Sequence, residues 1–95
     1  MSVTIAGIEF EDHEHDDRGD VLYVAVKGYD AGGLPPHAYA SPEGHGIEFD
    51  EQGRVIAMTL VNLKWLLERD GELRIAWPDG HISHDDPPRM LAAAA

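Results

Sequence analysis

Residues 46–61 read GIEFDEQGRVIAMTLV, and this stretch carries the strongest fold signal in the chain. Apolar and polar residues alternate over residues 46–50, and an apolar run rich in β-branched residues follows over residues 54–61. Alternation with a period of two is typical of a strand with one buried face. Gly53 lies between the two runs and can adopt the positive φ that a tight turn requires. The stretch therefore predicts a β-hairpin.

Further strands are predicted in the part of the chain that precedes this hairpin. Residues 3–10 alternate around Gly7 and predict a half-buried strand with a bulge at the glycine. Residues 21–26 are almost continuously apolar, which is typical of a central strand with both faces at least partly covered. Residues 37–40 predict a short edge strand inside a long loop rich in glycine and proline.

One short helix and a second hairpin follow the first hairpin. Asn62 is a suitable N-cap for a helix over residues 63–70, and Gly71 is a suitable end. The helix has an apolar face formed by Leu63, Leu66 and Leu67. Residues 73–77 and 81–84 flank the turn signal Pro78-Asp79-Gly80 and predict two short strands.

Together these elements predict an α+β fold. We expect a small antiparallel sheet of about four to six strands, with one short helix packed on one face. Residues 1–86 would form a single domain and residues 87–95 a flexible C-terminal tail.

Composition excludes several classes of protein. The 95 residues include 18 acidic and 7 basic side chains, which gives a net charge of −11, and 43% are hydrophobic. This charge disfavours direct binding to nucleic acid, because it repels phosphate. There is no cysteine, so disulfides and thiolate sites are excluded. The longest apolar stretch, residues 55–63, is too short to span a membrane, and no signal peptide is evident, so we expect a soluble cytoplasmic protein.

Two motifs resemble the YuzE-like family of small bacterial proteins of unknown function. Phe10, an acidic connector and the strand sequence of residues 20–26 are similar to the start of that family, and residues 46–58 are similar to its second motif. The resemblance covers residues 8–62 and implies a small α+β fold with no established catalytic residues. Some members lie beside genes for ribonuclease-like toxins, so the resemblance also suggests an antitoxin-like partner of another protein. The connector at residues 11–19 and the loop at residues 29–46 are longer here than in the family.

The acidic connector over residues 11–20 has two alternative interpretations. The first is a solvated turn between two strands, because charge runs usually lie in solvent. The second is a site for a divalent metal ion such as Zn²⁺ or Ni²⁺. Its candidate ligands are Asp12, His13, His15 and Asp16. If the stretch is extended, the two histidines project to one side and the carboxylates to the other.

The predicted helix offers a candidate surface for binding a partner. At about 100° per residue, Trp65 points away from the leucine face. An exposed tryptophan is a plausible anchor of an interface, and Lys64 and Arg69 could flank it. The alternative is a tryptophan that is partly buried along the sheet or under the long loop.

The leading functional hypothesis is a non-enzymatic protein-interaction module, in which the acidic chain binds a basic partner or forms a homodimer. The first alternative is the divalent-metal protein described above. The second is a small enzyme with a site in the loop at residues 29–46, where His37, Tyr39 or His45 would act against an acid. No motif for nucleophilic catalysis or for phosphate binding supports the enzyme hypothesis.

Overall fold

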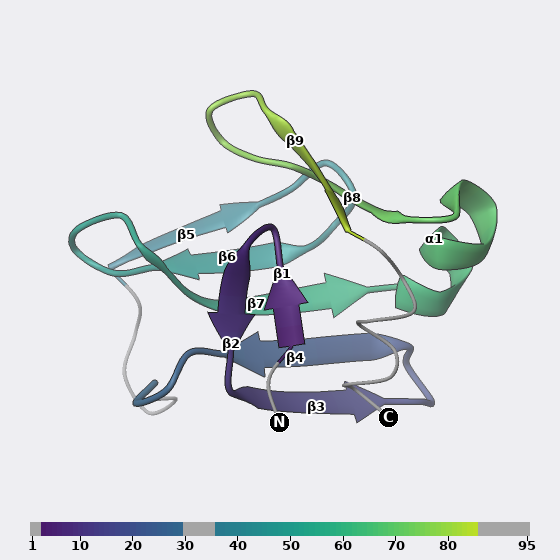
Figure 1. The fold of residues 1–95 in the computed structure, drawn as a ribbon, viewed down its shortest axis with the longest axis horizontal. Coiled ribbons are helices and arrows are strands. Elements are labelled where there is room, and N and C mark those ends of the chain that lie inside the picture. The colour runs from purple at the N-terminus through teal and green to yellow at the C-terminus, as the bar shows by residue number, and fades with distance from the viewer. Residues whose placement is uncertain (1–2, 30–35, 86–95) are drawn as a thin grey trace.

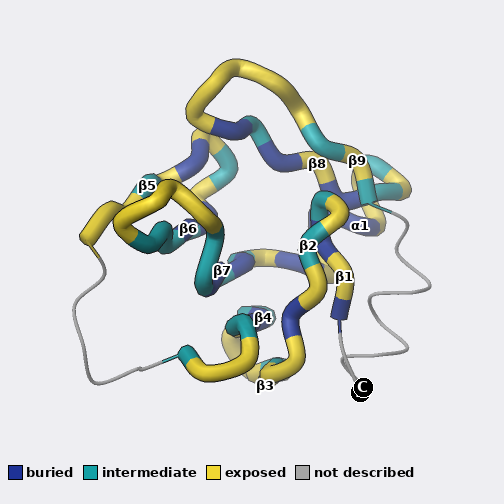
Figure 2. The backbone as a smooth tube through the Cα atoms, turned by 60° about the vertical axis from the view of Figure 1, so that its left-hand side comes forward, coloured by how far each residue is buried: buried dark blue, intermediate teal, exposed yellow. Residues whose placement is uncertain are grey.

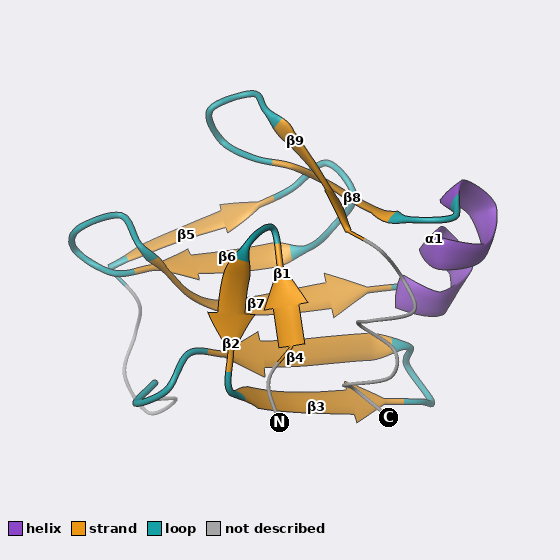
Figure 3. Ribbon diagram, in the orientation of Figure 1, coloured by secondary structure: helices purple, strands orange, loops and turns teal. Residues whose placement is uncertain are grey.

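The computed structural model describes residues 3–29 and 36–85. These residues form nine strands and one helix (Figures 1 and 3). The strands make up one five-stranded sheet and two hairpins, and every pairing is antiparallel. The predicted α+β class is therefore confirmed in outline. Within the described residues, no helix is long and apolar enough to cross a membrane.

The five-stranded sheet has the order β3-β4-β7-β6-β5. Its strands are β3 (Asp12–Asp16), β4 (Val21–Ala25), β5 (His37–Ala40), β6 (Gly46–Phe49) and β7 (Val55–Val61). The predicted hairpin is confirmed as β6–β7, and the predicted edge strand as β5. The predicted central position is confirmed for β4, but one of its two faces is only partly covered, because Tyr23 on that face is exposed. The Asp50 carboxylate accepts hydrogen bonds from the backbone N–H of Gln52 and of Arg54, at 2.9 and 2.8 Å, and so fixes the hairpin turn.

The acidic connector is partly a strand, so the predicted turn over residues 11–20 is wrong for its first half. Asp12–Asp16 forms β3 and pairs with β4, and only the following residues form the turn. This stretch becomes a strand because of its tertiary contact with β4. Alternation places His13 and His15 on the side of the buried Val24 and Leu22, while the carboxylates lie in solvent. An edge strand tolerates this charge, which also discourages pairing with another sheet.

Residues 3–10 form a hairpin and not the single bulged strand that we predicted. Strands β1 (Val3–Ile5) and β2 (Ile8–Phe10) pair antiparallel and are joined by Ala6 and Gly7. Both joining residues have positive φ, 53° and 78°, as a two-residue type I′ turn requires. A glycine between two alternating runs is compatible with a bulge or a turn, and here the chain reverses.

The helix α1 (Leu63–Asp70) ends as predicted but begins differently. Gly71 has φ 73° and donates its N–H to the Leu67 carbonyl at 2.8 Å, which closes the last turn. Asn62 occupies the N-cap position with φ 53°, and its side chain makes no capping hydrogen bond. The cap is Asp20, from the β3–β4 turn. Its Oδ2 accepts from the N–H of Lys64 at 2.8 Å and of Trp65 at 3.4 Å.

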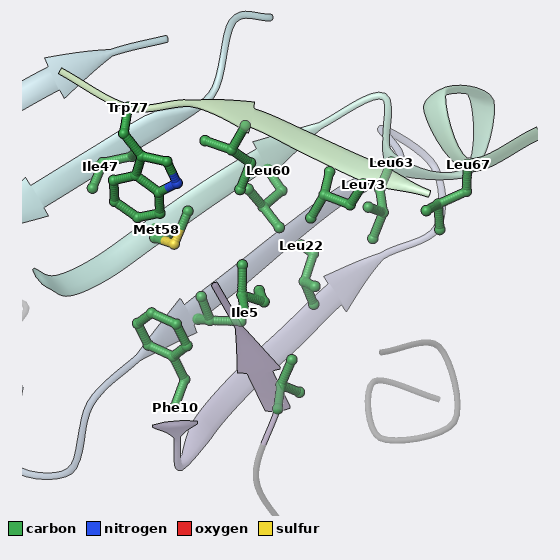
Figure 4. Packing of buried hydrophobic residues seen from close by; sticks show 13 residues of the cluster. Ile5, Phe10, Leu22, Ile47, Met58, Leu60, Leu63, Leu67, Leu73 and Trp77 are labelled. Atoms are coloured by element: carbon green, nitrogen blue, oxygen red, sulfur yellow. The ribbon is translucent and has the colours of Figure 1, made fainter. Parts of the chain in front are cut away.

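One hydrophobic core joins these elements (Figure 4). It is completed by the third sheet, a hairpin of β8 (Leu73–Ala76) and β9 (Ile82–Asp85), which confirms the second predicted hairpin. All three sheets and α1 contribute core residues: Val3, Ile5, Phe10, Leu22, Val24, Ile47, Met58, Leu60, Leu63, Leu67, Leu73, Ile75 and Trp77. Figure 1 places α1 beyond the end of β7 and next to β8. That the helix covers a face of the sheet stays a prediction, and the predicted tail at residues 87–95 lies outside the described residues.

Candidate functional site

The five-stranded sheet has one face toward the core and one face away from it. Leu22, Leu60 and Met58 point to the core, so their strand neighbours point outward. We call the outward side the outer face. Tyr23 lies on it with 48% of its surface exposed.

Small residues in the middle of the outer face create a hollow. The register aligns Asp12 of β3, Ala25 of β4, Ala57 of β7 and Glu48 of β6 in one row. At about 4.8 Å between neighbouring strands, the two acidic residues are about 14 Å apart along the row. The alanines between them have no atoms beyond Cβ, which leaves a hollow of about 280 Å³. We call it the outer-face hollow.

The outer-face hollow is lined by carboxylates and aromatic rings. Besides the two alanines, its outward-facing strand residues are Asp12, Glu14, Tyr23, Glu48 and Thr59, and Tyr29 lines it from the segment after β4. The Tyr29 hydroxyl donates a hydrogen bond of 2.6 Å to Glu48 Oε2, which holds that carboxylate beside the ring. Among the residues that the structure describes, no lysine or arginine lines the hollow. Within residues 3–29 and 36–85, none of its three carboxylates forms an ion pair. The hollow is therefore suited to a cation.

The four candidate metal ligands are not brought together. The alternation expected for an extended stretch is present in β3, so Asp12 and Asp16 lie on the opposite side of the strand from His13 and His15. The described part of the chain contains no group of three or more His, Asp or Glu residues that could hold a metal ion. Of the four, Asp12 is an outward-facing residue of the outer-face hollow.

His15 instead belongs to a network that joins β3 to the helix. Its Nδ1 lies 3.1 Å from Asp17 Oδ1, and its Nε2 lies 3.4 Å from Asp20 Oδ1. The Lys64 ammonium donates to Asp17 at 3.1 Å, and this contact lowers the pKa of the Asp17 carboxyl. The network ties the acidic turn to the start of α1, which is a structural role.

The candidate partner-binding residues divide into two groups. Trp65 is 56% exposed, which agrees with the first alternative for this residue, and the Arg69 guanidinium lies 4.8 Å from the centre of its ring. Both side chains line a hollow beside α1. Lys64 pairs with Asp17 and lines neither this hollow nor the outer-face hollow.

The residues named for the enzyme hypothesis lie apart from the outer-face hollow. His37 is exposed on β5, and the Tyr39 hydroxyl donates to the Ala76 carbonyl at 3.0 Å. His45 is fully buried, its Nδ1 accepts the Val61 N–H at 3.1 Å, and burial lowers its pKa. Residues 30–35 of the proposed loop site lie outside the described residues.

Sequence reasoning missed most of the outer-face hollow. Glu14, Tyr23, Tyr29, Glu48 and Thr59 were not identified as site residues. The tyrosine inside the apolar run at residues 21–26 could have indicated this face, because its hydroxyl favours the solvent-exposed side of a strand.

Comparison with known proteins adds no relative. No family model matches the chain, and no curated protein or solved structure matches it. The YuzE-like resemblance therefore stays a prediction.

Proposed function

We propose that this protein is a non-enzymatic interaction module that binds a basic segment of a partner protein over its outer face. The observation that carries the proposal is the outer-face hollow, which is lined by three carboxylates and two tyrosines and, among the described residues, by no lysine or arginine that would neutralise them. An antitoxin-like role, in which the partner is a basic toxin, is one form of this function.

The size and chemistry of the hollow favour a cationic side chain. Its volume of about 280 Å³ lies just below the range of about 300–1,000 Å³ that is typical of small-molecule sites. A guanidinium can form two parallel hydrogen bonds to one carboxylate and can lie over a tyrosine ring. The net charge of −11 would accelerate the approach of a basic partner, and salt would weaken this attraction.

The test compares two variants of equal net charge. The site variant carries Asp12→Asn, Glu14→Gln and Glu48→Gln. The control variant carries Glu9→Gln, Glu51→Gln and Glu68→Gln, which are exposed residues that do not line the hollow. Both variants change the net charge from −11 to −8. The probe is a fluorescein-labelled oligo-arginine peptide, and the readout is fluorescence anisotropy at low and at high salt.

We expect the site variant to lose about tenfold or more in affinity, and the control variant to lose far less. Equal losses of affinity in both variants would show that binding of the peptide depends only on the net charge, and would overturn the proposed site. The same pair of variants applies to a natural partner. A protein captured from a cell extract supports the proposal only if the control variant retains it and the site variant does not.

A further inference from the structure

A second surface lies beside α1, away from the outer-face hollow. Two adjoining hollows of about 290 and 180 Å³ share Glu43, Leu66 and Arg69 as lining residues. The first also reaches Trp65, and the second reaches Ile82 on β9. We call the joined hollows the α1 groove. Within the described part of the chain, it shares no lining residue with the outer-face hollow.

The α1 groove gathers exposed apolar surface. The described residues contain three large hydrophobic side chains that are exposed, namely Tyr23, Trp65 and Ile82. Two of them border this groove, Trp65 at 56% and Ile82 at 55% exposure. Figure 2 shows that the β8–β9 turn, which leads into Ile82, is exposed. Arg69 lies against the Trp65 ring and limits the rotamers of this side chain.

The charges that line the α1 groove are balanced. Glu43 and Asp70 are negative, whereas Arg69 and Arg74 are positive, so the lining side chains sum to zero. Glu72, which pairs with Arg74, brings the local sum to −1 on a chain whose net charge is −11. Each arginine already pairs with a neighbouring carboxylate, Arg69 with Asp70 at 2.9 Å and Arg74 with Glu72 at 3.0 Å. The groove therefore has little electrostatic attraction for a strongly charged partner of either sign.

We propose that the α1 groove binds a second copy of this chain and forms a two-fold symmetric homodimer. Two copies repel each other over their acidic surfaces, so contact is least opposed where the local charge is close to zero. In a two-fold interface, a residue i of one copy contacts a residue j of the other, and j contacts i. Arginines and carboxylates on the same surface can then form ion pairs across the interface, around Trp65 and Ile82 as buried anchors.

The dimer and the proposed binding of a basic partner respond oppositely to salt. Screening weakens the attraction between the acidic outer face and a basic peptide. It also weakens the long-range repulsion between two chains of equal charge, so the dimer should become tighter. The dimer proposal does not depend on the proposed function, and each one can fail alone.

The test measures mass by sedimentation velocity over about 1 µM to about 1 mM protein, at low and at high salt. We expect a monomer–dimer equilibrium that Trp65→Ser and Ile82→Ser each weaken by about tenfold or more. The matched control is Tyr23→Ser, which removes the exposed side chain of the outer face. All three residues lie outside the core cluster, and circular dichroism checks that each variant is folded.

A charge exchange tests the geometry independently. Arg74→Glu and Glu43→Arg should each weaken the homodimer, and an equal mixture of the two variants should form a heterodimer. Recovery of dimer formation in the mixture supports ion pairing between these two positions across a symmetric interface. A wild-type chain that stays monomeric over the whole concentration range at high salt overturns the proposal, as does a dimer that only Tyr23→Ser disrupts.

Discussion

Replacing Asp20 tests how this chain begins its only described helix. Its Oδ2 accepts the N–H groups of Lys64 and Trp65, the second and third residues of α1, which are the two donors that a local N-cap side chain normally satisfies. Asp20 also has φ 51°, and its carbonyl accepts the Leu63 N–H at 3.3 Å. The side chain therefore joins the β3–β4 turn to the helix across 44 positions of sequence.

The expected cost of Asp20→Ala has three parts. Loss of an N-cap side chain costs about 1 kcal/mol, and loss of a carboxylate at the positive end of a helix costs about 0.3–1 kcal/mol. Alanine at a left-handed φ adds about 1 kcal/mol, since it lacks the local hydrogen bonds that let Asp adopt this conformation. The free energy of unfolding should fall by about 2–3 kcal/mol in total.

Two further variants separate these parts. Asp20→Asn keeps an oxygen acceptor and tolerates the left-handed conformation, so it should lose only about 0.3–1 kcal/mol, and added salt should reduce this loss. Asp20→Gly removes the cap and relieves the backbone, so its cost should fall between the other two. Urea unfolding followed by circular dichroism gives the three values. The reasoning is refuted if Asp20→Ala stays within about 0.5 kcal/mol of wild type, or if Asp20→Asn is equally destabilising.

The remaining predictions concern histidines. Burial lowers the pKa of His45 from its ordinary value of 6.5, so below that pH the unfolded chain binds a proton that the folded chain resists. Stability should therefore fall as the pH drops below about 6.5 toward the folded pKa, and urea titrations should show a smaller fall in His45→Phe than in wild type. An unchanged pH dependence in that variant would count against this assignment. For metal binding, calorimetry should give the same Zn²⁺ affinity for wild type and for the double variant His13→Ala, His15→Ala, because β3 separates these side chains from the carboxylates. A loss of about tenfold or more would restore the metal hypothesis.

Much of the fold could be predicted because its signals are local. The hairpin at residues 46–61 combines alternation with a glycine turn, and both features act over a few residues. The signal for the end of the helix, Gly71, also acts over only a few residues. Where the sequence interpretation was wrong, the deciding contact is distant. β3 is a strand because β4 pairs with it, and composition alone argues for a turn. Asn62 follows the local rule for a cap, yet Asp20 makes the cap from another part of the chain.

The candidate site was harder to predict than the fold, because it depends on strand order. Asp12 and Glu48 lie on the same hollow only because β4 and β7 separate β3 from β6, and no short motif encodes that order. Alternation does predict which side of a strand each residue occupies. It placed the carboxylates of residues 12–16 opposite the histidines, and the structure agrees.

The acidic residues of β3 combine two effects on association. On an edge strand, exposed carboxylates oppose pairing with another sheet edge, including that of a second copy. The same carboxylates contribute Asp12 and Glu14 to the outer-face hollow, where a basic partner would be attracted. Self-association is thereby directed toward the charge-balanced α1 groove. Because the two surfaces share no lining residue, a dimer formed through the α1 groove would carry two free outer-face hollows. A partner with two basic segments that can span them would then bind more tightly than either segment alone, through the higher effective concentration of the second.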